Sequence, residues 1–159
     1  ELTLVDTKIT AASWKHFAGI KKLRTLHVGT QNRATDADLK YVSGLTDLEE
    51  LHLWHTELTD DGMNHLAGLT RLRDLTFQST KFTGSGLKSL AGLKDLRYIY
   101  AEAPITDEGS KSLAGLKQLR EFAAGRSEMT NEAMKNIAEL KKLRMLNLNN
   151  SKISNPGLN

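Results

Sequence analysis

The sequence predicts an α/β solenoid, in which strand and helix units of similar length stack side by side. Two observations lead to this fold class. A leucine recurs at intervals of 23 to 25 residues, and the stretches after it switch from an apolar period of two to a helical period. A fixed period in this range is typical of stacked repeats. We expect a single domain over 1–159 with about seven repeats, near 1–22, 23–47, 48–71, 72–95, 96–118, 119–142 and 143–159.

The first half of each repeat is predicted to be a short strand. After the opening leucine, apolar residues alternate with polar or variable ones, which places one set of side chains inside and the other outside. The expected inward pairs are Leu26/Val28, Leu51/Leu53, Leu75/Phe77, Ile99/Ala101, Phe122/Ala124 and Leu146/Leu148.

The second half of each repeat is predicted to be a short helix. In the third repeat, Met63, Leu66 and Leu69 are apolar at helical spacing. A Thr-Asp or similar pair precedes most of these segments, and we expect its short oxygen-bearing side chains to cap the helix. The glycines near the helix ends, Gly19, Gly44, Gly68, Gly92 and Gly115, are expected to end the helices in a left-handed conformation.

The pattern TDxGLxxLAGLxxL resembles the leucine-rich repeat family, and within it the bacterial repeats common in planctomycete-type proteins and the ribonuclease-inhibitor-like class. The resemblance implies a horseshoe with a concave parallel β-sheet and convex short helices. The family's asparagine ladder is replaced here by hydroxyl residues, which bond the backbone more weakly. We therefore expect a less regular ladder at Thr7, Thr56, Thr80, Ser127 and Ser151.

Composition limits the classes of function. The net charge of +3 is too mild to require nucleic acid or a membrane surface as a partner. The chain has no cysteine, so disulfides are excluded, and no signal peptide or membrane segment is visible. Both ends look like uncapped repeats, and we expect the chain to be a fragment of a longer protein. These features leave the cellular compartment open.

The outward strand positions are the candidate binding surface, because the inward positions are occupied by packing. Neighbouring strands lie about 4.8 Å apart, so these positions form parallel rows across the concave face. Aromatic side chains in such rows are typical interface anchors. The candidate binding residues are His27, His52, Trp54, Asp74, Gln78, Tyr98, Tyr100 and Glu102. The small outward residues of the last two repeats predict a flat area there, at Ala123, Gly125, Asn147 and Asn149.

His27 and His52 are expected to be direct neighbours in one of these rows. Two imidazoles could share a metal, but the sequence offers no clear third and fourth ligand, so no metal site is predicted. Adjacent histidines resist double protonation, and a pH-sensitive pair is our hypothesis for them.

A basic edge is expected where the strands begin. Its simplest interpretation is a solvated rim, while binding of a polyanion is an alternative that the neighbouring acidic row would weaken. No aromatic residue interleaves the cations as a single-strand binder requires, so no nucleic-acid partner is expected. The edge consists of Arg24, Arg73, Arg97, Arg120 and Arg144.

An enzyme is not predicted. The chain has no cysteine nucleophile, no H-E-x-x-H and no G-x-S-x-G motif, and no cofactor motif is present. We expect a module that recognises a protein partner through its concave face. The alternative is a structural or regulatory segment that packs against another domain of its own full-length protein. A third possible function is polyanion binding along the arginine edge.

Overall fold

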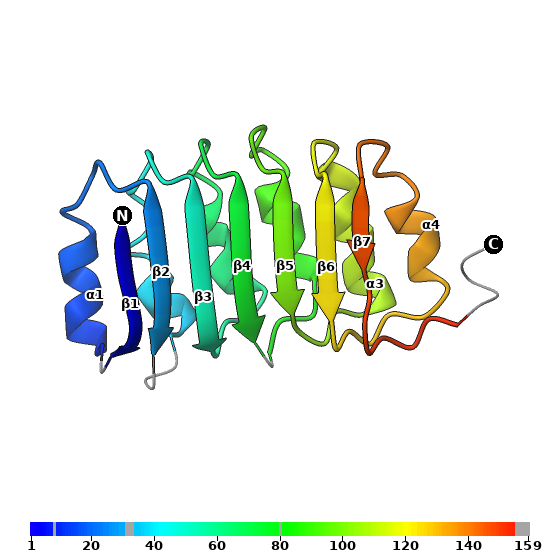
Figure 1. The fold of residues 1–159 in the computed structure, drawn as a ribbon, viewed down its shortest axis with the longest axis horizontal. Helices are drawn as coiled ribbons and strands as arrows, with labels where there is room; N and C mark the ends of the chain where they lie inside the picture. The colour runs from blue at the N-terminus through cyan, green and yellow to red at the C-terminus, as the bar shows by residue number, and fades with distance from the viewer. Residues whose placement is uncertain (8, 31–33, 80, 155–159) are drawn as a thin grey trace.

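The computed structural model describes residues 1–7, 9–30, 34–79 and 81–154. Seven parallel strands form one open sheet in sequence order, so each strand pairs with its neighbours in the chain. Figure 1 shows the strands side by side, with the helical segments behind them. The predicted α/β leucine-rich-repeat solenoid is therefore confirmed. The strands are β1 Leu2–Thr7, β2 Thr25–Thr30, β3 Glu50–Thr56, β4 Asp74–Ser79, β5 Tyr98–Glu102, β6 Glu121–Gly125 and β7 Met145–Asn147.

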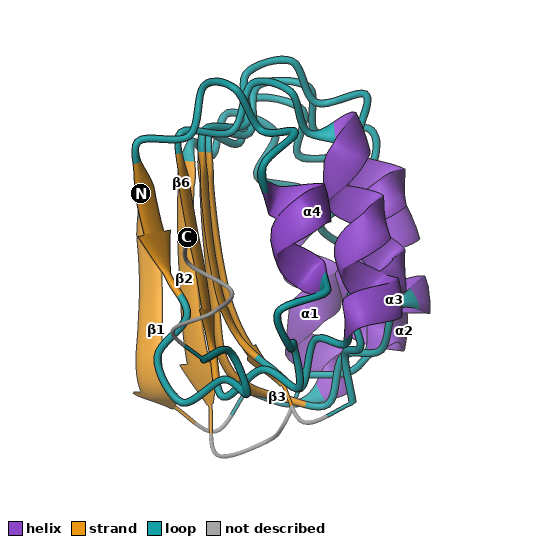
Figure 2. Ribbon diagram, turned by 90° about the vertical axis from the view of Figure 1, so that its right-hand side faces the viewer, coloured by secondary structure: helices purple, strands orange, loops and turns teal. Residues whose placement is uncertain are grey.

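The helical segments all cover one face of the sheet, as the end-on view in Figure 2 shows. They are short, and three of them are 3₁₀-helices. None of the helices in the described part of the chain has the length and apolar character that crossing a membrane requires. The segments are α1 Ala11–Phe17, α2 Asp36–Leu39, η1 Asp61–Leu66, η2 Ser85–Leu90, α3 Asp107–Ser110, η3 Lys111–Gly115 and α4 Ala133–Ile137.

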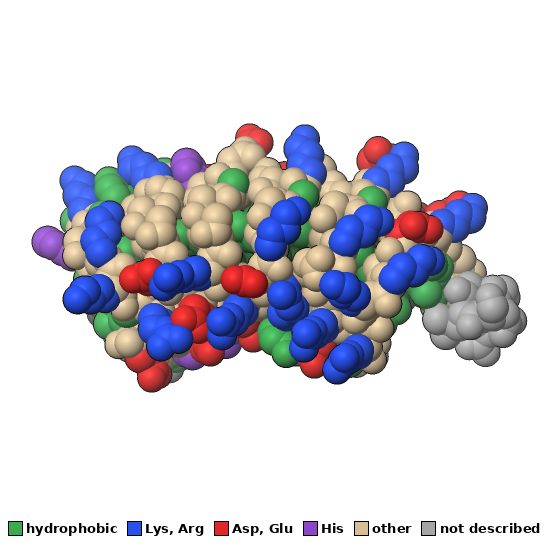
Figure 3. Space-filling view, turned by 90° about the horizontal axis from the view of Figure 1, so that it is seen from above, with side chains coloured by type: hydrophobic (Ala, Val, Ile, Leu, Met, Phe, Trp, Pro, Cys, Tyr) green, Lys and Arg blue, Asp and Glu red, His purple; other side chains and the backbone are tan. Residues whose placement is uncertain are grey.

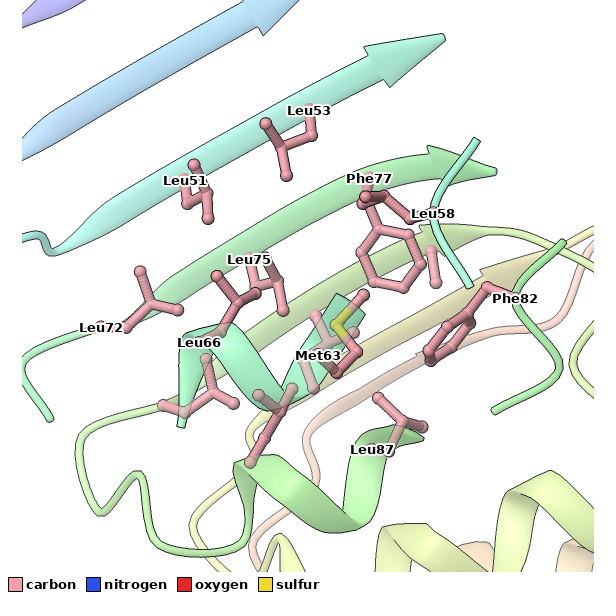
Figure 4. Close-up of a cluster of buried hydrophobic side chains, with 14 of the residues drawn as sticks. Leu51, Leu53, Leu58, Met63, Leu66, Leu72, Leu75, Phe77, Phe82 and Leu87 are labelled. Carbon is pink, nitrogen blue, oxygen red and sulfur yellow. The ribbon is translucent and has the colours of Figure 1, made fainter. Parts of the chain in front are cut away.

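The core is a continuous apolar layer between the sheet and the helices. Leu51 and Leu53 of β3 are fully buried, whereas His52 between them faces away from the core and is partly exposed. Figure 4 shows how strand leucines point toward Met63 and Leu66 of η1. Burial of each such side chain contributes roughly 1.5–3 kcal/mol to folding. The predicted alternation of apolar and polar residues thus separates side chains in the core from side chains on the face of the sheet that carries no helices.

The Thr-Asp pairs do more than cap helices, because most of them link neighbouring repeats. Thr106 caps its own helix as predicted, since its Oγ1 accepts a hydrogen bond from Gly109 N at 3.0 Å. The aspartate of a pair, however, reaches the threonine of the next repeat. Asp36 accepts from Thr59 N at 3.0 Å and from Thr59 Oγ1 at 2.6 Å. The same arrangement joins Asp60 to Thr83 and Asp107 to Thr130. Asn131 accepts from Ser154 N at 3.0 Å and donates through Nδ2 to Ser154 Oγ at 3.0 Å.

The predicted left-handed glycines at the helix ends are wrong. Among the described glycines, Gly84 alone has a positive φ, of 103°. The helices end instead in tight turns with i to i−3 hydrogen bonds, such as Leu69 N to Leu66 O at 3.0 Å. Such turns keep right-handed backbone angles and need no glycine conformation. Gly84 stands where other repeats carry the linking aspartate.

The hydroxyl ladder is present in the middle of the sheet. Thr56 Oγ1 donates to Gln78 O at 2.7 Å, and Ser79 Oγ donates to Leu58 O at 2.6 Å. Thr80, predicted for this ladder, lies outside the described residues, and the register places Ser79 beside Thr56. At Thr7 and Ser127, the buried hydroxyls have no hydrogen-bond partner within the described parts of the chain. The ladder is therefore irregular, as its weaker hydroxyl groups predict.

Candidate functional site

The face of the sheet without helices, called the open face here, carries all eight candidate binding residues. They lie on the four adjacent strands β2 to β5. The parallel register aligns His27 with His52, Thr76 with Tyr100, and Gln78 with Glu102. Their side chains are all partly exposed. The structure thus brings together on one surface residues from positions 27 to 102 of the chain.

A cluster of three rings occupies the β2 and β3 part of this face. The His27 and His52 rings are stacked, with centroids 4.1 Å apart and planes 6° from parallel. Trp54 meets both rings edge-on, at 5.9 Å from His27 and 5.4 Å from His52. Gly29 leaves room for the indole of Trp54, because a Cβ atom at residue 29 would lie only 3.3 Å from Trp54 Cε3. The indole therefore lies over a glycine of the neighbouring strand and is held in place by the histidines.

Carboxylates flank the histidine pair. His27 Nε2 lies 3.9 Å from Glu50 Oε2, and His52 Nε2 lies 3.4 Å from Asp74 Oδ1. Burial lowers the pKa of His27 below its ordinary value, and the neighbouring His52 lowers it further. Within the described residues, no group of three or more histidine, aspartate or glutamate side chains is arranged to hold a metal ion.

Tyr100 is fixed by a carboxylate of the next strand. Its hydroxyl donates a hydrogen bond to Glu121 Oε2. This hydrogen bond, together with burial, raises the pKa of Tyr100 to about 12. Tyr98 lies in the adjacent row, between Asp74 of β4 and Glu121 of β6. Both tyrosines of the open face therefore stand beside negative charge.

A pocket of about 360 Å³ lies at the carboxyl ends of β3 to β6. Glu102 lines it, accepts a hydrogen bond from Gln78 Nε2 at 2.8 Å and pairs with Arg126 Nε at 2.8 Å. His55 and Arg126 both line the pocket and both have left-handed backbone angles, with φ of 55° and 59°. Non-glycine residues seldom adopt this conformation, and such strain concentrates at functional surfaces.

A second hollow of about 340 Å³ extends from Trp54 to Asn150 in the last repeat. Tyr100 and Gln78 line it together with the small residues Ala123 and Gly125. The small residues that lead us to expect a flat area thus line one part of a wide, open hollow. Short side chains on β6 leave space beside larger ones on β3 and β5, and that difference in size forms the hollow.

Sequence reasoning did not include His55, Glu121 or Arg126 among the candidate residues. The outward position of Glu121 was visible in the repeat pattern. His55 and Arg126 carried no such signal, because each follows the regular part of its strand and depends on a left-handed angle. In β3 the register also shifts between Leu53 and Thr56, so one extra residue enters at His55.

The predicted basic edge lies where the strands begin, and Figure 3 shows Lys and Arg gathered along it with Asp and Glu among them. Glu49 binds two of its arginines. Its Oε1 accepts from Arg24 Nε at 2.7 Å, and its Oε2 lies 3.3 Å from Arg73 Nη1. Arg97 donates to Lys94 O at 2.6 Å. The carboxylate between these arginines is therefore Glu49, on the edge itself, rather than the acidic row of the open face.

No protein-family model and no curated protein matches the sequence. Among solved structures, the chain is similar to internalin C2 from Listeria monocytogenes, at 20% identity and a TM-score of 0.45, over 92% of this chain and 77% of that one. It is also similar to an internalin F from the same organism, at 19% identity and a TM-score of 0.41, over 89% of this chain and 59% of that one. At these values the similarity assigns no role to any residue.

Proposed function

We propose that the chain is a recognition module that binds a protein partner through the open face. The observation that carries this proposal is the grouping of Trp54, Tyr98 and Tyr100 on the one face that no helix covers, beside a hollow. Large aromatic side chains dominate the binding free energy of protein interfaces when they enter or line such hollows.

Two of the three anchors, Trp54 and Tyr100, are held by contacts within the chain. Trp54 is held against the two stacked histidines, and the Tyr100 hydroxyl is bound to Glu121. Side chains fixed before binding lose little conformational entropy on association, which increases affinity for a given contact area. Gln78 and Glu102 form a polar border next to these anchors and are expected to select among partners.

The partner is a separate protein or, alternatively, another domain of the full-length protein. Polyanion binding along the arginine edge is less well supported, because Glu49 neutralises part of the charge of Arg24 and Arg73. That the repeats are of the planctomycete-like bacterial type and the ribonuclease-inhibitor-like class stays a prediction from the sequence pattern.

Capture from a lysate of the source cells tests the proposal. The chain is compared with its Trp54→Ala/Tyr98→Ala/Tyr100→Ala variant, and circular dichroism establishes that both are folded. A matched control, Ile20→Ala/Lys40→Ala/Lys88→Ala, removes three side chains from the helical side. We expect a protein that is captured by the chain and the control but lost by the aromatic variant. Equal capture by all three would place binding elsewhere and contradict the proposal.

A further inference from the structure

We infer that the partner presents an arginine-containing basic segment to the open face. The inference rests on the proposed function and adds the chemistry of the partner. It begins from an asymmetry of charge. The chain has 22 Lys and Arg against 19 Asp and Glu, yet the outward positions of the described strands hold no Lys or Arg. Those positions hold four carboxylates, Glu50, Asp74, Glu102 and Glu121.

Within the described part of the chain, basic side chains leave most of this negative charge unpaired. Glu102 pairs with Arg126, whereas Glu50 and Asp74 contact histidines, which carry a charge only when they are protonated. Glu121 accepts its hydrogen bond from a neutral tyrosine. Of the arginines at the strand starts, Arg24 and Arg73 pair with Glu49, and Arg97 pairs with Asp95. The open face is therefore negative at neutral pH on a protein that is positive overall, and such a surface attracts a basic one.

The aromatic side chains suit the same partner. Tyr98 stands between Asp74 and Glu121 on neighbouring strands, roughly 4.8 Å from each along the row. A guanidinium group that stacks on this ring can reach a carboxylate on either side. Arginine combines planar stacking on aromatic rings with two-point hydrogen bonding to carboxylates, whereas the compact ammonium group of lysine does neither as well. We therefore assign arginine to this position.

The hollow beside Tyr100 gives room for a second basic side chain. Trp54 and Tyr100 line it, as do Glu102 and Arg126, which pair with each other. An arginine stem can pack along the rings while its charged end remains near Glu121, the carboxylate that bonds the Tyr100 hydroxyl, as long basic side chains do on apolar surfaces. The predicted partner thus carries at least two arginines, on a segment extended enough to lie across β4 to β6.

A labelled peptide of alternating glycine and arginine tests this inference by fluorescence anisotropy. Matched peptides carry lysine, the neutral analogue citrulline, or glutamate in place of arginine. We expect the arginine peptide to bind best, the lysine peptide more weakly, and the citrulline and glutamate peptides not measurably. Binding should weaken as the ionic strength rises. Equal binding of the arginine and citrulline peptides would overturn the inference.

Charge variants test whether peptide binding depends on the carboxylates of the open face or only on the net charge of the protein. Asp74→Asn/Glu121→Gln removes two carboxylates of the open face, and Glu108→Gln/Glu132→Gln removes two from the helical side. We expect the first variant to bind the arginine peptide about tenfold more weakly or worse, and the second to bind it unchanged. Equal losses would mean that binding follows net charge alone and would overturn the inference. Glu50→Gln provides a further test, because that side chain is exposed and makes no internal hydrogen bond in the described structure.

The two proposals fail in different ways. If lysate capture depends on the aromatic residues but Asp74→Asn/Glu121→Gln leaves it intact, the open face binds a protein and the basic partner is wrong. If capture does not depend on the aromatic residues, the proposed function itself is wrong.

Discussion

Asp60 holds Thr83 of the following repeat through both of that residue's hydrogen-bond donors. Asp60 Oδ2 accepts from Thr83 Oγ1 at 2.6 Å and from Thr83 N at 3.1 Å. Its other oxygen accepts from Gly84 N at 3.0 Å and Gly86 N at 2.7 Å. One carboxylate thus satisfies four donors at the start of η2, whereas Asp36 and Asp107 each accept two hydrogen bonds from the following repeat.

Replacing Asp60 with Asn should lower the free energy of unfolding by about 1–3 kcal/mol, because the amide turns two donor hydrogens toward backbone N–H groups. Burial acts to raise the pKa of Asp60, but the hydrogen bonds from Thr83, Gly86 and Gly84 outweigh it and lower the pKa below 3.8. The stabilisation is therefore present above that value and is lost as the pH falls below it.

Urea unfolding over a series of pH values measures this effect. The control is Asp61→Asn, at the exposed neighbouring position, which should keep both the stability and its acid dependence. If the Asp60→Asn protein shows the same stability and the same slope below pH 3.8 as the unchanged protein, the proposed link is wrong.

Trp54 depends on Gly29 for its position. A Cβ atom at residue 29 would lie 3.3 Å from the indole, so Gly29→Ala should force a small shift and Gly29→Leu should displace the ring from the histidines. We expect stronger acrylamide quenching of tryptophan fluorescence, since Trp14 is only 1% exposed and contributes little change. Gly125→Ala is the control, because a Cβ there would meet nothing closer than Glu102 Cγ at 3.9 Å. Unchanged quenching in Gly29→Leu would show that the contact does not hold the indole.

The repeat pattern was sufficient to predict the strands, their order and their outward rows, because a two-residue period has only one arrangement that buries Leu51 and Leu53 together. The links between repeats were missed for a physical reason. A threonine and aspartate before a helix match a capping signal, and whether Asp60 bonds its own repeat or the next depends on stacking distance. The ring contacts of Trp54 could not be predicted from the sequence either, because they depend on side-chain rotamers.

The Tyr100 hydroxyl should resist ionisation. Its hydrogen bond to Glu121 and its burial raise its pKa to about 12, so the near-ultraviolet absorbance of tyrosinate should develop in two steps on a base titration. Glu121→Gln should bring the late step down toward the ordinary value of about 10. Tyr100→Phe should abolish the late step, which identifies the residue. A late step that survives in Tyr100→Phe would assign it to another tyrosine and contradict the prediction.

His55 should be less favourable to stability than glycine at its position. Its φ of 55° costs a side chain with a Cβ about 1 kcal/mol, and the side chain is exposed. We expect His55→Gly to raise the free energy of unfolding by about 0.5–1 kcal/mol, and His55→Ala to leave it unchanged or lower it. Equal urea midpoints for the two variants would show that the backbone angle carries no strain.

His27 should remain neutral to a lower pH than an ordinary histidine. Burial lowers its pKa, and so does the positive charge that the stacked His52 can carry, while Glu50, Glu1 and Asp74 act in the opposite direction. Because the unfolded chain then binds the proton more readily, stability should fall as the pH drops below about 6.5. Protonation would also add positive charge to the open face and weaken binding of a basic peptide.

Nuclear magnetic resonance of the imidazole Cε1 protons gives the titration directly, with His27→Asn to identify the signal. In His52→Asn, the His27 signal should titrate at a higher pH than before, because one of the two causes of the low pKa is gone. Burial remains, so the shift should be partial. A His27 signal that titrates at or above the ordinary value in the unchanged protein would remove the basis for a pH-sensitive pair, whatever the stacking distance.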